Sequence, residues 1–147
     1  GFLSGKLKID ESDEYLVDID LKGFPRRFPS VWETGERIPR IKDRHIYDNS
    51  KSCCFTTSAK EQILLKTKIK TLQQFINIIA IPYFQNNSFY ELNKHYKYGG
   101  YSHGILGKIQ GYGDILETED IKIIVLALML RISRKSFNRN DNCFCGK

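Results

Sequence analysis

One alternating stretch decides the fold: Tyr15-Leu16-Val17-Asp18-Ile19-Asp20-Leu21. Its apolar residues recur at every second position, the period of a strand with one buried face. The segment Lys6–Ile9 alternates as well, and the polar turn Asp10–Glu14 joins the two segments into a hairpin. A third short strand is predicted at Ser30–Glu33. Three strands in succession predict an antiparallel β-meander.

Helices are predicted in the second half of the chain. From Thr71 to Leu92 apolar residues recur at helical spacing, and Pro82 either kinks this helix or starts a second segment. Asp120 is a suitable N-cap for a last helix over Ile121–Ile132. Because this last helix is apolar on most of its sides, we expect it to be buried.

The remaining segments are predicted to be loops. Glu36–Lys70 shows no clean helical period and is interpreted as a loop with one short strand around Cys53–Phe55. Asn93–Gly113 is rich in tyrosine and glycine and is interpreted as an ordered loop. The order of the elements predicts an α+β fold in which helices cover one face of the meander.

Composition fits one globular domain with a hydrophobic core, since the 147 residues are 41% apolar and 27% charged. The longest apolar stretch, Ile121–Ile132, contains Lys122 and is shorter than the roughly 20 residues of a membrane span, so no transmembrane helix is expected. No signal peptide is visible after Gly1, and a cytoplasmic protein is expected.

The four cysteines fall in two pairs, Cys53-Cys54 and Cys143-x-Cys145. Adjacent Cα atoms lie about 3.8 Å apart, whereas a relaxed disulfide needs roughly 4.4–6.8 Å. A secreted scaffold held by disulfides is therefore disfavoured. Cysteines placed in this way in a reducing compartment are more often catalytic or metal-binding.

Two segments resemble the ubiquitin-conjugating enzyme family. In that family a Tyr/Phe-Pro pair leads a proline-rich strand, and a His-Pro-Asn tripeptide precedes the catalytic cysteine. The matching residues here are Phe24-Pro25-Arg26-Arg27-Phe28-Pro29-Ser30-Val31-Trp32-Glu33 and Arg44-His45-Ile46-Tyr47-Asp48-Asn49-Ser50-Lys51-Ser52-Cys53-Cys54-Phe55.

The closer resemblance is to stand-alone bacterial members encoded in CBASS (cyclic-oligonucleotide-based signalling) anti-phage operons. These carry Glu-Thr-Gly-x-Arg-Ile-Pro-Arg and Asp-Arg-His ahead of the cysteine. The corresponding residues are Glu33-Thr34-Gly35-Glu36-Arg37-Ile38-Pro39-Arg40, Asp43-Arg44-His45, Pro82-Tyr83, Tyr90-Glu91 and His103-Gly104. The resemblance implies a ubiquitin-conjugating-enzyme-like domain over residues 1–133. This sequence lacks the helix that family members usually have ahead of the first strand.

The resemblance implies a cysteine acyl carrier. The carboxyl donor would be the C-terminus of a partner cGAS-like nucleotidyltransferase, held as a thioester on Cys54 and then passed to an acceptor or kept to prime the cyclase. A thiol suits this role because a thioester keeps its acyl group activated. No cofactor is implied, and the sequence contains no Gly-x-x-x-x-Gly-Lys-Ser/Thr nucleotide loop.

Cys54 is the predicted nucleophile. In the relatives apolar residues flank the reactive cysteine, so Cys53 takes the buried position and Cys54, before Phe55, takes the exposed one. Alternation along a strand lets only one of the two side chains face solvent. The reverse assignment stays open, as does the alternative that both are small buried hydrophobic residues.

His45 and His103 are the other candidate catalytic residues, as general bases or orienting groups. For His45 a structural hydrogen bond that holds the loop is the favoured alternative, whereas for His103 catalysis and loop packing have equal support. Ile46-Tyr47 replaces the family's Pro-Asn, so the asparagine that would steady an oxyanion is absent. Asn49 or backbone N–H groups are the candidates to replace it.

The end of the chain, Cys143-Phe144-Cys145-Gly146-Lys147, resembles the opening of the SEC-C zinc motif. Two thiolates do not complete the tetrahedral site that zinc requires. We therefore interpret residues 134–147 as a basic tail that holds no zinc by itself, and no metal ligand is assigned.

Two other functions remain open. A non-catalytic adaptor that binds the cyclase or another protein is the main alternative, because inactive members of this fold serve as scaffolds. A small nucleic-acid-binding module is the third, since 23 Lys and Arg against 17 Asp and Glu give a net charge of +6. These charges are dispersed along the chain rather than clustered, so nucleic-acid binding is not favoured.

Overall fold

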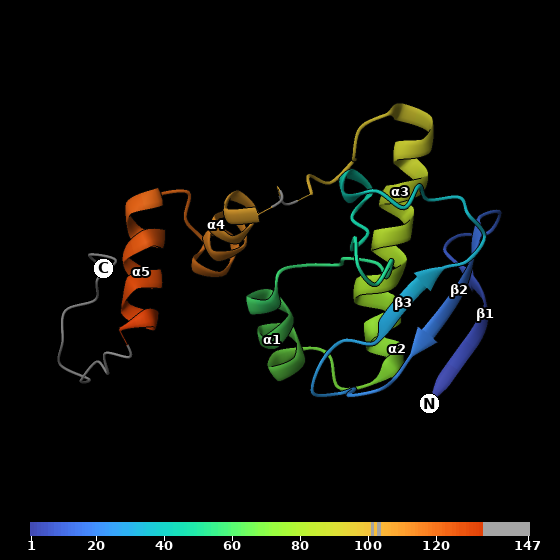
Figure 1. The fold of residues 1–147 in the computed structure, drawn as a ribbon, viewed down its shortest axis with the longest axis horizontal. Coiled ribbons are helices and arrows are strands. Elements are labelled where there is room, and N and C mark those ends of the chain that lie inside the picture. Colours follow the sequence, from blue (N-terminus) through green and yellow to red (C-terminus); the bar gives the residue numbers. More distant parts are fainter. Residues whose placement is uncertain (101, 103, 134–147) are drawn as a thin grey trace. The chain divides into compact units, whose positions relative to one another are not determined.

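The chain divides into two compact units, Gly1–Gly100 and Tyr101–Lys147 (Figure 1). The computed structural model describes residues 1–100, 102 and 104–133. The predicted site residue His103 lies outside the described residues, as does the predicted tail with Cys143 and Cys145.

The first unit contains a three-stranded antiparallel sheet. Its strands follow the order of the chain: β1 (Phe2–Lys8), β2 (Glu14–Asp20) and β3 (Ser30–Glu33). The register places Ile19 of β2 between Leu3 and Val31 of the neighbouring strands. The predicted meander is confirmed, and so is the α+β class.

A long helix covers the inner face of this sheet (Figure 1). It runs through α2 (Leu72–Phe75), a π segment (Ile76–Ala80) and α3 (Ile81–Asn93). Tyr15 of β2 and Phe84 of α3 meet in the core with ring centroids 4.6 Å apart, and both side chains are fully buried. The helix predicted between Thr71 and Leu92 is therefore confirmed.

Pro82 lies inside this helix rather than at a break. The π segment comes just before it, where the Ile81 N–H donates to the Ile76 carbonyl. Proline has no N–H to donate and crowds the preceding turn of an α-helix. The wider π turn relieves the crowding, so the helix continues past Pro82.

The helix α1 (Ser58–Thr67) corrects the prediction that Glu36–Lys70 is loop and strand. The Thr57 side chain caps it by accepting the Lys60 N–H. Of its residues only Leu65 is buried, so this helix has no apolar stripe from which a helical period could be recognised.

The second unit holds α4 (Gly104–Leu116) and α5 (Ile121–Ile132). α4 overturns the predicted loop over the second half of Asn93–Gly113. Its glycines disfavour a helix when considered alone, but they let α5 approach closely. A Cβ at Gly113 would lie 3.2 Å from the Ile124 side chain.

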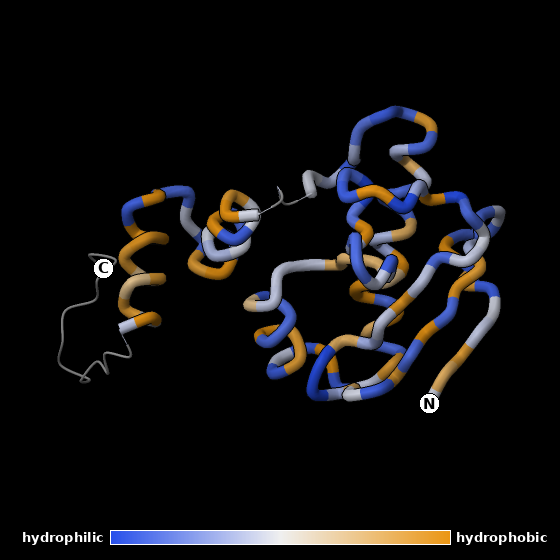
Figure 2. Tube along the Cα trace, viewed as in Figure 1, coloured by the Kyte–Doolittle hydropathy of each residue, from blue (hydrophilic) through white to orange (hydrophobic). Residues whose placement is uncertain are grey.

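The bounds of α5 agree with the prediction, and the Asp120 carboxylate accepts the Lys122 N–H at 2.8 Å. The expected burial is wrong. Ile124 is 3% exposed, but Ile121 and Ile132 are 62% and 80% exposed, because within this unit α4 packs on one side of the helix. Figure 2 shows the apolar character along the length of α5. None of the described helices is long and apolar enough to cross a membrane.

Candidate active site

The two adjacent cysteines lie at the end of a small hairpin, residues 45–54, which we call the cysteine hairpin. Ile46 and Cys53 form an antiparallel bridge across it. The Cys53 N–H donates to the Val31 carbonyl of β3 at 2.7 Å. This backbone bond ties the cysteine hairpin to β3.

The cysteine pair is divided between interior and surface. Cys53 is 4% exposed, and burial raises the pKa of its thiol to about 12. Its sulfur contacts the hydroxyl of Tyr83 on α3. Cys54 is partly exposed. Only Cys54 is placed to meet a substrate without the hairpin opening.

Tyr47 is the side chain that could activate the Cys54 thiol. Its hydroxyl lies close enough to the Cys54 thiol to influence the pKa of that thiol. Burial raises the pKa of Cys54, and the Tyr47 hydroxyl opposes that rise. Tyr47 stands where the resembling family has asparagine, so the hairpin has a phenolic O–H donor in place of an amide. Asn49, the predicted substitute, is exposed in the turn of the hairpin.

His45 positions Cys54 through its main chain. The Cys54 N–H donates to the His45 carbonyl at 2.7 Å, and the Tyr83 hydroxyl donates to the same carbonyl at 3.1 Å. His45 has φ of 54°, in the left-handed region. Its ring lies against Tyr96, with centroids 5.3 Å apart, and a Cβ at Gly100 would overlap it.

Arg44, the residue before His45, anchors the hairpin to α3. Its guanidinium is buried and donates to the Asn87 side-chain oxygen from Nη2 at 2.9 Å and from Nε at 3.2 Å. The same group lies over the Tyr90 ring, 4.3 Å from its centroid. A buried charge without such partners would be strongly destabilising, so these contacts fix where the hairpin begins.

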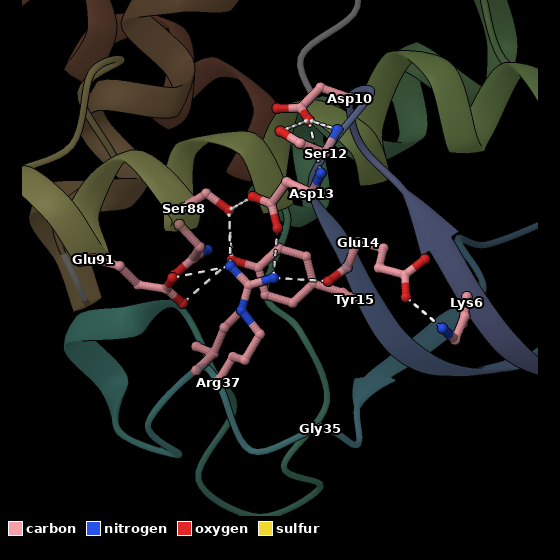
Figure 3. Close-up of polar contacts among 12 residues, drawn as sticks. Lys6, Asp10, Ser12, Asp13, Glu14, Tyr15, Gly35, Arg37, Ser88 and Glu91 are labelled. Atoms are coloured by element: carbon pink, nitrogen blue, oxygen red, sulfur yellow. Dashed lines mark hydrogen bonds and ion pairs between the residues drawn. The ribbon is translucent and has the colours of Figure 1, made fainter.

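A second arginine fixes the segment ahead of the hairpin (Figure 3). Arg37 donates to Asp13 at 2.6 Å and to Glu91 at 3.0 Å, and its guanidinium lies 3.9 Å from the centroid of the Tyr15 ring. The bond from Arg37 holds the pKa of Asp13 below its ordinary value. Ser88 joins the cluster through bonds to Asp13 and Tyr15.

Glu33 folds the loop that carries Arg37. Its carboxylate is buried and accepts the backbone N–H of Gly35 at 2.7 Å and of Ile38 at 3.3 Å. A Cβ at Gly35 would lie 2.9 Å from that carboxylate. The Glu-Thr-Gly-x-Arg-Ile pattern is thus a structural unit: acceptor, glycine, arginine and a buried isoleucine each hold the loop.

The predicted site residues are brought together only in part. Cys54 and the main chain of His45 are joined, while His103 lies outside the described residues. The anchors Arg44 and Asn87 were not predicted from the sequence. The sequence did contain a pattern that could have indicated these anchors. Polar or tyrosyl residues recur at helical spacing along α3, and they contact Arg37, Arg44 or His45: Tyr83, Asn87, Tyr90 and Glu91.

Among residues 1–100, 102 and 104–133, no group of three or more His, Cys, Asp and Glu side chains is placed to hold a metal ion. No protein-family model, curated protein or solved structure matches this chain.

Proposed function

We propose that this chain is a ubiquitin-conjugating-enzyme-like acyl carrier that holds its donor as a thioester on Cys54. The observation that carries the proposal is the division of the cysteine pair. Cys53 is sealed in the core, whereas Cys54 is partly exposed, held by a backbone bond to His45 and close to the Tyr47 hydroxyl.

The chemistry is an acyl transfer between sulfur atoms. Cys54 loses its proton as its sulfur attacks the carbonyl carbon of an activated donor. A new C–S bond forms, the bond to the leaving thiol breaks, and the proton goes to that thiol. Because burial raises the pKa of Cys54, the resting group is a thiol, and the Tyr47 O–H stabilises negative charge that develops during transfer.

The proposed donor is the C-terminus of a partner cGAS-like nucleotidyltransferase, and the outcome is priming of that enzyme in anti-phage defence. This part rests on the resemblance of Glu33–Arg40 and Asp43–His45 to the bacterial relatives. In the structure Glu33 folds the loop that carries Arg37, and Arg44 anchors the cysteine hairpin.

An adduct assay tests the proposal. Incubation with the activated donor should give an adduct that hydroxylamine or excess thiol removes. Cys54→Ala should abolish the adduct, Cys54→Ser should give one that resists thiol, and the control Cys53→Ala should keep most of it. An adduct that survives both alanine changes excludes a cysteine thioester, and loss only in Cys53→Ala moves the nucleophile to Cys53.

A non-catalytic adaptor is the second candidate. The observation that favours it is the raised pKa of Cys54, since a thiol that stays protonated is a poor resting nucleophile. An adaptor predicts that Cys54→Ala binds the cyclase as tightly as the wild type and keeps full protection against phage. Lost protection with binding intact would count against this candidate.

A further inference from the structure

The second unit leaves much of its apolar surface uncovered. Its two helices, α4 and α5, have 13 and 12 residues. In the described part of this unit, the buried residues are Gly107, Gly111 and Gly113 of α4 and Ile124 of α5. A pair of helices that buries so little apolar surface is not expected to be stable alone. A further apolar surface is therefore expected to cover it.

An exposed apolar stripe runs along α5, whose apolar character Figure 2 shows. It consists of four side chains with exposed fractions from 40% to 80%, which we call the α5 stripe: Ile121, Val125, Met129 and Ile132. Their spacing of three or four residues places them on one face of the helix. Ile124 belongs to a different face, because its side chain lies 3.2 Å from the position of a Cβ at Gly113. Lys122 is exposed at the border of the stripe, and its long side chain can keep the ammonium in solvent.

The exposed apolar side chains of the first unit are distributed over separate elements. Examples are Leu16 on β2, Ile63 on α1 and Ile78 in the π segment. By contrast, α5 of a second copy of the chain presents a stripe of the same length and polarity. Contiguous exposed apolar surface typically marks a site of association. The α5 stripe is therefore complementary to itself in length and in polarity.

The charges in the sequence around α5 indicate the direction of pairing. Acidic residues precede the helix, and basic residues stand in its last turn and after it: Glu117, Glu119 and Asp120, then Arg131, Arg134 and Lys135. Antiparallel pairing of two copies brings the acidic start of each helix to the basic end of the other, whereas parallel pairing brings like charges together. An anionic membrane would attract the basic end but repel the acidic start. The charges thus favour a second, antiparallel copy.

We propose that the chain forms a homodimer in which the α5 stripes of two copies pack antiparallel about a two-fold axis. The axis passes between Val125 and Met129, so Val125 of each copy contacts Met129 of the other. The four helices of two such units then share one apolar core, as in a helix bundle. The inference goes beyond the proposed function and does not depend on the chemistry of Cys54.

Sedimentation velocity of the full chain across a range of concentrations measures the association. We expect the wild type to dimerise with a Kd in the micromolar range, because four side chains form a small interface. Val125→Glu should weaken the dimer at least about hundredfold, since it buries an unpaired carboxylate. The control Ile63→Glu changes a side chain on α1 that is 41% exposed, against 40% for Val125, and should keep the wild-type Kd. Circular dichroism should show that both variants keep their helices.

Mixing experiments test the antiparallel direction. Met129→Glu and Val125→Lys should each be monomeric alone and should form a heterodimer when mixed, because the antiparallel arrangement places the carboxylate against the ammonium. In a mixture of Met129→Glu with Met129→Lys, the same arrangement leaves both charges against apolar side chains. This second mixture should therefore associate at least about tenfold more weakly than the first. The reverse order would show that the helices pair in parallel and would overturn the proposed arrangement.

Three other outcomes overturn the dimer. A wild-type chain that stays monomeric up to about 1 mM means that the α5 stripe is covered within one chain or by another protein. Binding of this monomer to anionic phospholipid vesicles, lost in Val125→Glu, would assign the stripe to a membrane surface. A dimer that persists in both Val125→Glu and Met129→Glu uses a different surface. The Cys54 adduct assay is independent of all three, so failure of the acyl carrier would leave the dimer standing.

Discussion

The backbone N–H of Cys54 donates to the carbonyl of His45 across 2.7 Å. The sequence placed His45 beside the nucleophile as a catalytic side chain or as a loop holder. The bond shows that its main chain holds the loop, since the carbonyl that receives Cys54 also receives the Tyr83 hydroxyl. His45 adopts φ of 54° to present this carbonyl.

We predict that His45→Ala keeps thioester formation within about threefold of the wild type, because the carbonyl remains. His45→Gly should be more stable than His45→Ala by about 1 kcal/mol, since the left-handed conformation costs alanine but not glycine. Chemical denaturation and the adduct assay give the two numbers. If both variants fold but lose about a hundredfold or more of the rate, the His45 ring takes part in the chemistry.

A second prediction concerns Tyr47 and pH. The Tyr47 hydroxyl opposes the rise that burial causes in the pKa of Cys54. Tyr47→Phe should therefore move the midpoint of Cys54 alkylation to higher pH and slow alkylation below it by roughly two- to fivefold. Alkylation of Cys54 by iodoacetamide is followed across pH by peptide mass spectrometry. Tyr98→Phe, at a residue 64% exposed, is the control. A midpoint that moves to lower pH in Tyr47→Phe would falsify the influence assigned to the Tyr47 hydroxyl.

The sheet and the central helix were predictable because their residues repeat with the period of the element. The alternation from Tyr15 to Leu21 marks β2, whose odd-numbered side chains Tyr15, Val17 and Ile19 are buried. α1 and α4 were not predictable in this way. α1 buries one side chain. α4 repeats apolar residues at helical spacing, but its glycines disfavour a helix when considered alone, and three of them are the residues that it buries.

The candidate site also has features that the sequence could predict and features that it could not. Alternation along a strand was enough to expect that Cys53 is buried and that Cys54 reaches the surface, and Cys54 is partly exposed. The role of Arg44 was not visible, because its partner Asn87 lies 43 residues later and is polar. Neither residue type indicates burial, and only the folded chain shows that each satisfies the other.

Cys53 leads to a third prediction, on alkaline stability. Burial raises its pKa from 9.0 to about 12 in the folded chain. The folded state therefore keeps a proton that the unfolded state releases. This contribution to stability is complete below pH 9.0 and is lost as pH rises toward 12.

Between these pH values Cys53 should lower the free energy of unfolding by up to about 1.4 kcal/mol per pH unit. Cys53→Ala should remove that slope, although it lowers stability at neutral pH by leaving a small cavity. Urea denaturation at several pH values measures both effects. Cys54→Ala is the matched control and should change the slope less, because Cys54 is partly exposed. Parallel curves for wild type and Cys53→Ala would contradict the prediction.

The last prediction concerns the anchor of the cysteine hairpin. Arg44 and Asn87 are both buried and joined by bonds of 2.9 and 3.2 Å to one oxygen, so each single alanine variant leaves the other group without its side-chain partner. Arg44 keeps the Asn87 main-chain carbonyl at 3.3 Å in Asn87→Ala, and Asn87 keeps its bond to the Tyr83 carbonyl in Arg44→Ala, so what each variant loses is the side-chain pair. We expect each to cost about 1–3 kcal/mol and the double variant to cost less than the sum by about 1 kcal/mol. The exposed pair of Lys42 and Asp48 is the control and should show no measurable coupling.

The same anchor should affect the reaction rate, because Arg44 precedes His45, whose carbonyl holds Cys54. Arg44→Lys should remain folded yet slow thioester formation, since an ammonium cannot bond Asn87 through a planar fork. A folded Arg44→Lys with the wild-type rate would show that the anchor serves stability alone.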